Sequence, residues 1–400
     1  MKNLIFPSLL LLTLLFLTGL AQAQTVAIPD ANFKTVLLNN TAINTNGDTE
    51  IQTIEAQSFS GNLNVNNRNI LDLTGIEAFT ALSGLDCGGN QLTNLNVTQN
   101  TALTSLSCHS NQLSSLNLAQ NTALEHLNCF YNQLTSLNLT QCTALTQLQC
   151  NNNQLNSLDL SACTALLHLD CSSNQLTSFN ITKNTALIRL DCSLNQISSL
   201  DLTACPALLN VSCSINQLSA LDLSQNLLLV HLYCSRNQLS SLDLSQNSAL
   251  KTLQCANNQL TFLNVKNGNN QAITSFMTFY NPNLTCIQVD NATYSSSNWP
   301  LIDLTSHFST NCFTNRTSLT ATEQNIKVYP NPIVQNFTVD LGQSQPTFTV
   351  QITNTTGQII LKKTYTNTQQ IEIALQEHSG IYFLTIYNEK EIFTTKIIKE

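Results

Sequence analysis

Residues 103–123 read LTSLSCHSNQLSSLNLAQNTA, and this 21-residue unit decides the fold. Nine copies follow one another without insertion or deletion. The cysteines that mark the copies recur every 21 residues: Cys87, Cys108, Cys129, Cys150, Cys171, Cys192, Cys213, Cys234 and Cys255. An Asn-Gln pair begins three residues after each cysteine, from Asn90-Gln91 to Asn258-Gln259. A constant period of this kind predicts one repeated structural unit, and each unit buries its apolar side against its neighbour.

Alternation within each unit predicts short strands. In Leu85-Asp86-Cys87, leucine and cysteine should point inward and aspartate outward. Leu95-Asn96-Val97 repeats this pattern, so we expect two short strands in each coil and coils spaced about 4.8 Å apart. The asparagine after each periodic cysteine should turn inward and bond backbone groups at the buried turn.

The periodic cysteines are expected to be buried, apolar, unpaired thiols. Stacked coils bring their Cα atoms close, but their Cβ vectors run parallel, which is poor geometry for a disulfide. A string of metal thiolates is the alternative, and the absence of C-x-x-C spacing argues against it.

The units resemble the leucine-rich repeat family in its short bacterial 21-residue form. Its pattern L-x-x-L-x-L-x-x-N/C-x-L matches the sequence, with cysteine where leucine is commoner, at Leu103, Leu106, Cys108, Asn111 and Leu113. The resemblance covers about residues 63–290 and implies a mainly β, parallel solenoid or horseshoe with strands at the L-x-C segments. Nine repeats then occupy residues 82–268.

An N-terminal cap is expected over residues 24–81, because a solenoid end exposes core. A short helix is predicted there, with Asp30 as its N-cap and one apolar face made of Phe33, Val36 and Leu37. The following loop has oxygen-bearing side chains at EF-hand ligand offsets: Asn44, Asn46, Asp48, Glu50 and Glu55. Thr49 stands where such loops usually carry glycine. A calcium site is therefore possible, but an Asn/Asp-rich turn before a short helix is the favoured interpretation.

The repeat pattern decays over residues 269–317, which we interpret as the C-terminal cap of the solenoid. Cys286 and Cys312 lie outside the period and form the candidate disulfide. Residues 318–325 are then a linker. Alternating apolar stretches follow over residues 326–400, and about seven short strands in that length predict a small immunoglobulin-like β-sandwich.

The C-terminal segment resembles the sorting domain of type IX (Por) secretion cargo. The matching stretches are Val328-Tyr-Pro-Asn-Pro332, Asn354-Thr-Thr-Gly357, Ser379-Gly-Ile-Tyr-Phe383 and Lys396-Ile-Ile-Lys399. The resemblance implies contact with the type IX machinery and export to the outer-membrane exterior. It also implies that such domains are often removed and the protein attached to lipid-linked polysaccharide at the surface.

The N-terminus and the composition agree with an exported protein. Residues 1–23 have a Lys2-bearing start, an apolar run and the small-residue end Ala21-Gln22-Ala23, which predict a signal peptide cleaved before Gln24. Only 10% of residues are charged, the net charge is −8, and the 15 basic residues are scattered. This distribution disfavours a nucleic-acid binder. We find no motif for a hydrolase, a kinase or a metalloprotease, and we predict no catalytic residues and no cofactor.

Comparison of the copies with one another indicates where a ligand binds. Outward positions of the second segment are uniformly Asn or Asp with Ser or Thr beside them, as at Asn96 and Asn117. The outward side of the L-x-C segments and the adjoining turn vary instead, and the variable candidates are His126, Phe130, Tyr131, His168, Asp170, Arg189, Asp191, Tyr233 and Arg236. Aromatic and arginine side chains on a surface otherwise rich in Ser and Asn are typical of recognition, although neutral drift on a solvated face is an alternative.

Two functional hypotheses follow. The first is a secreted or cell-surface, non-enzymatic module that binds a protein or glycan through the L-x-C face. The second is a passive coat or spacer, or a water-ordering protein of the ice-binding kind, that uses the uniform Ser/Thr/Asn face. Architecture alone does not choose a ligand, since one scaffold serves unrelated partners.

Overall fold

The computed structural model describes residues 24–312, 317–318, 326–356, 358–387 and 391–400. The expected signal peptide, most of the linker and part of the predicted C-terminal cap (residues 313–316) lie outside these ranges. The chain divides into two compact units, Met1–Ser309 and Thr310–Glu400, which we describe separately. No helix within the described ranges has the length and apolar character needed to cross a membrane.

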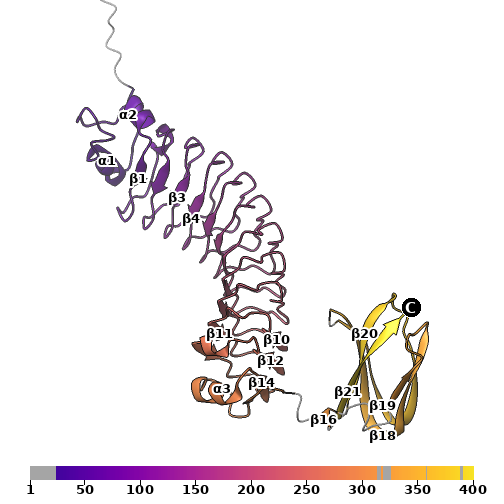
Figure 1. The fold of residues 1–400 in the computed structure, drawn as a ribbon. Helices are drawn as coiled ribbons and strands as arrows, with labels where there is room; N and C mark the ends of the chain where they lie inside the picture. Colours follow the sequence, from indigo (N-terminus) through magenta and orange to yellow (C-terminus); the bar gives the residue numbers. More distant parts are fainter. Residues whose placement is uncertain (1–23, 313–316, 319–325, 357, 388–390) are drawn as a thin grey trace, which may run out of the picture. The chain divides into compact units, whose positions relative to one another are not determined.

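The repeats build an 11-stranded parallel sheet to which each coil contributes three residues. Its strands are β1 (Asn62–Asn64), β2 (Gly84–Asp86), β3 (Ser105–Ser107), β4 (His126–Asn128), β5 (Gln147–Gln149), β6 (His168–Asp170), β7 (Arg189–Asp191), β8 (Asn210–Ser212), β9 (His231–Tyr233), β11 (Thr252–Gln254) and β13 (Ser275–Met277). Figure 1 shows this sheet along the inner curve of the arched solenoid. The ladder includes one strand beyond the nine predicted repeats at each end, β1 and β13.

A second sheet on the opposite side is shorter than predicted. It has four strands, β10 (Ser241–Asp243), β12 (Phe262–Asn264), β14 (Cys286–Gln288) and β15 (His307–Ser309). In the earlier coils the second L-x-L segment, such as Leu95–Val97, forms no strand, so the prediction of two strands per coil is wrong there. In an arch the outer side of the stack is longer than the inner side, which works against the spacing of about 4.8 Å that a ladder needs.

Stacked apolar columns fill the interior of the solenoid. The central leucine of each inner strand, such as Leu127 and Leu148, is almost wholly buried and lies opposite its counterpart in the next coil. Twelve cysteines are buried and free, including all nine periodic ones. Burial raises the pKa of the Cys129 thiol well above its usual range, and the neighbouring Cys150 adds to the shift. The predicted column of buried, unpaired thiols is confirmed.

An asparagine column connects the coils. The side-chain amide of Asn111 donates to the carbonyl oxygens of Cys108 (3.1 Å) and of Cys87 in the preceding coil (3.0 Å). Its Oδ1 accepts from the backbone N–H of Leu92 at 3.0 Å. One side chain thus satisfies buried backbone groups of two coils, which confirms the inward asparagine that the spacing predicts.

Short helices close the two ends of the solenoid. The helices are α1 (Ala31–Leu38), α2 (Thr53–Ser58) and α3 (Ala292–Asn298), with 3₁₀ turns at Ile76–Ala78 and Asn270–Ala272. Asp30 caps α1, because its carboxylate accepts from the N–H groups of Asn32 and Phe33 at 2.9 Å. At the other end Trp299 stacks on Phe276, with ring centroids 4.2 Å apart. Cys286 and Cys312 are both disulfide-bonded in this region.

The C-terminal unit is an antiparallel β-structure around its own core, consistent with a β-sandwich. Its strands are β16 (Thr317–Ser318), β17 (Lys327–Tyr329), β18 (Asn336–Asn354), β19 (Ile359–Ala374), β20 (Gly380–Tyr387) and β21 (Glu391–Lys399). Alternation at 337–341 and at 348–352 predicts two of the short strands, but both stretches belong to one strand, β18. An irregularity between Asp340 and Gln345 shifts the register within it. A bulge of this kind bends a strand without ending it, which alternation alone does not reveal.

Candidate functional site

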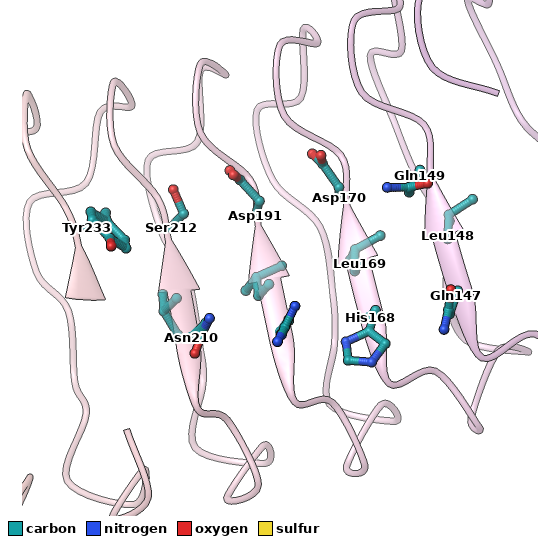
Figure 2. A pocket seen from close by; sticks show the side chains of 13 residues that line it. Gln147, Leu148, Gln149, His168, Leu169, Asp170, Asp191, Asn210, Ser212 and Tyr233 are labelled. Atoms are coloured by element: carbon teal, nitrogen blue, oxygen red, sulfur yellow. The ribbon is translucent and has the colours of Figure 1, made fainter. Parts of the chain in front are cut away.

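A groove of about 620 Å³ lies on the outward face of strands β5 to β9 of the inner sheet. It brings together five of the predicted site residues. Its outward side chains form two rows (Figure 2). The first row is made of the leading residue of each strand, Gln147, His168, Arg189 and Asn210, and the second row of the third residue, Gln149, Asp170, Asp191, Ser212 and Tyr233. Leu148, Leu169, Leu190 and Val211 are buried between the two rows.

The strand pleat positions these groups. Leu169 and Leu190 are 2% exposed, so the residues on either side of each must face outward. Parallel pairing in register then sets His168 beside Arg189, and Asp170 beside Asp191. Every second-row side chain is therefore one strand spacing, about 4.8 Å, from the next.

Asp170 and Asp191 form an acidic pair in the second row. Each Oδ1 accepts the backbone N–H of the serine two residues later, at 3.0 Å. The Oδ2 atoms accept no hydrogen bond from the described residues, and no cationic side chain there pairs with either carboxylate. Partial burial, with Asp191 as a further contributor, raises the pKa of Asp170 despite the hydrogen bonds from Ser172.

The first row carries the complementary charge. The guanidinium of Arg189 is exposed and forms no ion pair with the described part of the chain. Partial burial and, secondarily, Arg189 lower the pKa of His168, so this imidazole is neutral at neutral pH. The Nδ1 atom of His168 is buried and has no hydrogen-bond partner among the described residues. The groove thus places one cation, Arg189, in the first row and two carboxylates, Asp170 and Asp191, in the second row, with buried residues between the rows.

An aliphatic row lies beside the first row, outside the residues that line the groove, and is not among the predicted site residues. The residue immediately before the strand is aliphatic in four consecutive coils: Leu167, Ile188, Leu209 and Val230. Backbone hydrogen bonds link these four positions coil to coil, and Leu209 is 37% exposed. Other coils carry Thr104, Glu125, Thr146 or Lys251 at this position. The difference between the coils is visible in the sequence. In repeats so rich in aliphatic residues, however, the sequence does not distinguish these four from residues of the core.

A second element, the turn ridge, follows the second row outside the residues that line the groove. It consists of the aliphatic Leu194 and Ile215 and the charged Arg236. Each occupies the second position after the periodic cysteine in consecutive coils, and all three have left-handed backbone, with φ of 56°, 58° and 56°. Leu194 and Ile215 are 48% and 38% exposed. Every coil has this left-handed turn. The position holds Gly89, Asn152 and Asn257, which tolerate the conformation, and also Ser110, Tyr131 and Ser173. For a β-branched residue such as Ile215 it is unfavourable.

The predicted residues Phe130, Tyr131 and His126 lie apart from the groove, on β4 and its following turn. Phe130 stacks on His109, with ring centroids 4.6 Å apart, and Tyr131 meets Phe130 edge-on at 5.5 Å. His109 in turn lies against the backbone of Gly88, where a Cβ atom would clash with its ring. Most of this group is packed against itself, and only Tyr131 is highly exposed.

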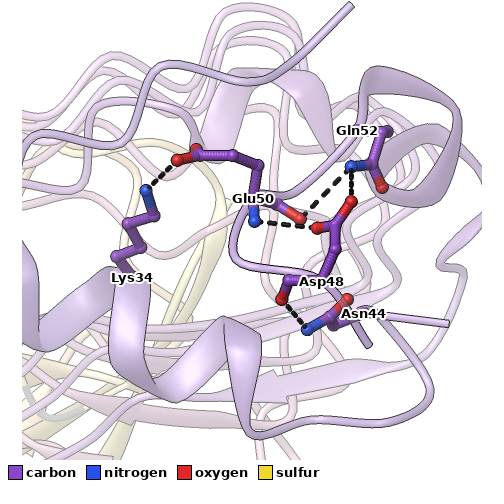
Figure 3. Close-up of polar contacts among 5 residues, drawn as sticks. All are labelled: Lys34, Asn44, Asp48, Glu50 and Gln52. Atoms are coloured by element: carbon purple, nitrogen blue, oxygen red, sulfur yellow. Dashed lines mark hydrogen bonds and ion pairs between the residues drawn. The ribbon is translucent and has the colours of Figure 1, made fainter. Parts of the chain in front are cut away.

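The candidate calcium loop is closed by its own hydrogen bonds. Asp48 accepts from the side chains of Asn46 and Gln52 and from the N–H of Glu50, while Glu50 pairs with Lys34 at 2.7 Å, as Figure 3 shows in part. Asn44 donates to the carbonyl oxygen of Asp48. These acceptors do not converge on an ion.

Glu55, the last predicted ligand, is also engaged. Its Oε1 accepts from the N–H and hydroxyl of Thr45 at 2.8 and 2.9 Å, and its Oε2 from the N–H of Gln52 at 3.0 Å. Burial acts to raise the pKa of Glu55, but these hydrogen bonds outweigh it and the pKa is lowered. Across the described residues no group of three His, Cys, Asp or Glu side chains is arranged to hold a metal. Hydrogen bonds within the loop engage these candidate ligands and close it as a turn that seats α2.

The uniform outward row of the second segment has a structural cause. Asn138 and Asp201 accept the backbone N–H and the hydroxyl of the threonine two residues later, and Asp222 accepts the N–H of Ser224. Asn or Asp followed by Ser or Thr closes this turn in coil after coil. Its regularity therefore follows from folding.

Sequence profiles match both parts of the chain. The profile described as "Endo-beta-N-acetylglucosaminidase EndoS LRR domain" matches residues 37–174. The profile described as "Secretion system C-terminal sorting domain" matches residues 327–400, and such a domain marks a protein for secretion or the cell surface. Comparison of the sequence with curated proteins gave no match.

Solved structures share the solenoid. The functional domain of InlJ from Listeria monocytogenes, described as including a cysteine ladder, is 24% identical with a TM-score of 0.59, and the match covers 94% of this chain and 100% of that one. An internalin from the same organism, inlF, is 21% identical with a TM-score of 0.58, covering 70% and 91%. At these identities the likeness concerns the fold. Repeats, solenoid and terminal domain together show that the chain is a leucine-rich-repeat protein with a type IX secretion C-terminal sorting domain.

Proposed function

We propose that this secreted or surface protein is a non-enzymatic binding module that recognises a protein or glycan through the groove on β5 to β9. The observation that carries the proposal is the coincidence of three departures from the repeat in the same coils. Charged first-row and second-row residues, the aliphatic row and the turn ridge all fall between residues 167 and 236. Exposed apolar groups beside unpaired charges on a rigid sheet are what a recognition surface needs.

A purely structural origin does not account for these departures. The aliphatic row places half-buried or exposed aliphatic side chains where other coils carry threonine, glutamate or lysine, and the turn ridge sets bulky residues in left-handed backbone. A passive coat or spacer has no use for either. The uniform opposite face, by contrast, is accounted for by closure of its turns.

Binding is tested by probing protein and glycan arrays with the full chain. Hits are then measured with Arg189→Ala combined with Tyr233→Ala, two outward residues of the groove that belong to no core cluster. The control is Asn117→Ala, at an exposed position on the opposite face. We expect the double variant to weaken capture with an unchanged melting temperature and the control to bind as wild type. If all groove variants bind as wild type, this face is not the site.

We also propose that the sorting domain delivers the protein to the outer-membrane exterior through the type IX machinery, where attachment to lipid-linked polysaccharide follows. The support is the match of residues 327–400 to a secretion sorting domain. In a host with this system, deletion of residues 326–400 should leave the protein inside the outer membrane. Surface proteolysis of intact cells reads the result, and export of the truncated chain would contradict it.

A further inference from the structure

We propose that the occupant of the groove is a polypeptide that presents a basic side chain to Asp170 and Asp191 and apolar side chains to the aliphatic row and the turn ridge. This inference rests on the proposed function and adds the chemistry of the partner. It is carried by charge complementarity and by the aliphatic side chains beside the groove.

The acidic pair lacks a cation. Asp170 and Asp191 are directly opposite each other on neighbouring strands, and their Oδ1 atoms are held by backbone N–H groups. The Oδ2 atoms accept nothing from the described residues, although both side chains are half-buried. Two carboxylates one strand spacing apart repel each other. A lysine or arginine between them relieves that repulsion and forms charge-assisted hydrogen bonds to both.

The borders call for aliphatic contact. On one side, Leu167, Ile188, Leu209 and Val230 form a continuous apolar edge across four coils. On the other side, Leu194 and Ile215 occupy the same position in the turns of adjacent coils. A hydrogen bond from the N–H of Asn195 to the carbonyl oxygen of Ile215 joins the two turns. Branched aliphatic side chains match apolar side chains of a polypeptide. A glycan, whose recognition relies on hydroxyl hydrogen bonds and aromatic platforms, leaves both borders uncovered.

The left-handed turn is common to all the coils, and what distinguishes the ridge is its exposed aliphatic side chains. Leu194 and Ile215 adopt φ of 56° and 58°, a conformation that costs non-glycine residues free energy. Asn152 and Asn257 hold the same place in other coils at lower cost. Because the two side chains are exposed, what they offer is contact with a partner.

The test separates charge from scaffold with matched variants. Asp170→Asn with Asp191→Asn removes two charges from the groove but keeps the Oδ1 acceptors of both turns, as Asn128 already does in the same row. Asp201→Asn with Asp222→Asn removes two charges from equivalent turns on the opposite face. For the apolar borders, Leu194→Asn with Ile215→Asn is compared with Leu227→Thr and Leu228→Ala, two exposed leucines of a different turn restored to the repeat consensus.

The probe is a library of random short peptides displayed on phage, selected on the immobilised full chain. We expect enriched peptides to carry lysine or arginine flanked by apolar residues. Their binding should fall about ten-fold or more in Asp170→Asn/Asp191→Asn, since charged hydrogen bonds are lost, and should also fall in Leu194→Asn/Ile215→Asn. Both control pairs should bind as wild type, and added salt should weaken the wild-type interaction.

Other outcomes overturn the proposal. Enrichment of acidic peptides, or equal loss in the groove and control pairs, excludes the acidic pair as the docking point. Failure to enrich any peptide, combined with glycan-array hits that depend on Arg189, rejects a polypeptide partner but leaves the groove as the binding site. If the selected peptides or glycans bind every groove variant as tightly as the wild type, the proposed function itself is rejected.

Discussion

The side-chain amide of Asn132 donates to the carbonyl oxygen of Cys108, 24 residues earlier in the chain, at 3.1 Å. The same amide donates to Cys129 at 3.1 Å, and its Oδ1 accepts from the N–H of Leu113. A single buried side chain therefore links two coils at a point where no regular ladder satisfies the turn. The relation recurs in the neighbouring coils, as at Asn153 and Asn174.

Replacement of this asparagine should destabilise the solenoid. Asn132→Ala leaves the buried N–H of Leu113 without its acceptor, which costs about 1–3 kcal/mol. The carbonyl oxygens of Cys108 and Cys129 each lose one of two donors and keep the amides of Asn111 and Asn153. We expect the free energy of unfolding to fall by about 1–3 kcal/mol in chemical denaturation. The exposed Asn138→Ala in the same coil loses bonds to Thr140 alone and should cost under about 1 kcal/mol. Equal effects would show that the inward column carries no special weight.

Replacing a strained residue of the turn ridge should instead raise the free energy of unfolding. Ile215→Asn places a residue that tolerates left-handed backbone at φ 58°, and we expect a gain of roughly 0.5–1 kcal/mol in unfolding free energy. The reverse exchange, Asn152→Ile at φ 54°, should destabilise by a similar amount. Urea titrations of the two variants check the pair. A loss of stability in Ile215→Asn contradicts the strain argument.

Titration of Asp170 should couple stability to pH. Burial, with Asp191 as a further cause, raises the folded-state pKa of Asp170, so the folded protein holds this proton more tightly than the unfolded chain. The stability that protonated Asp170 contributes is present at pH values below its pKa in the unfolded chain. This stability is lost as the pH rises through the higher pKa of Asp170 in the folded protein. Asp170→Asn should therefore raise the melting temperature at neutral pH. That gain should shrink in acid.

Asp201 provides a control of opposite sign. Hydrogen bonds from the hydroxyl and N–H of Thr203 lower the pKa of Asp201, so its contribution is present above the unfolded pKa and lost as pH falls. Asp201→Asn should slightly lower the melting temperature at neutral pH and not in acid. Melting curves of both variants across the acidic range make the comparison, and parallel behaviour of the two contradicts the assignment of causes.

The buried, unpaired cysteines should not react with thiol reagents in the native protein. Burial raises the thiol pKa values, to about 12 for Cys213, so neither access nor thiolate is available to a maleimide reagent. We expect no labelling until the chain is unfolded in guanidinium, and then reaction at the twelve free cysteines. Cys286 and Cys312 should react only after reduction. Rapid native labelling would remove the basis for placing cysteine inside the solenoid.

Much of the fold could be read from spacing alone. The cysteine and asparagine columns follow from the 21-residue period, since identical units can stack only if equivalent residues meet. The candidate site was found in part: His168, Asp170, Arg189, Asp191 and Tyr233 stand out because they replace Ser or Asn on a variable row and do line the groove. The aliphatic row was missed because an exposed leucine looks like a core leucine in one dimension.

The sequence by itself determined the repeat, the inward columns and the sorting domain, because these depend on period and local alternation. Only the tertiary structure decided that second strands pair in the C-terminal coils alone, and that Leu194 and Ile215 carry positive φ. It also decided that the predicted calcium ligands turn onto their own loop. These features depend on the curvature of the stack and on which polar group reaches which partner. Neither is encoded in the spacing of any single repeat.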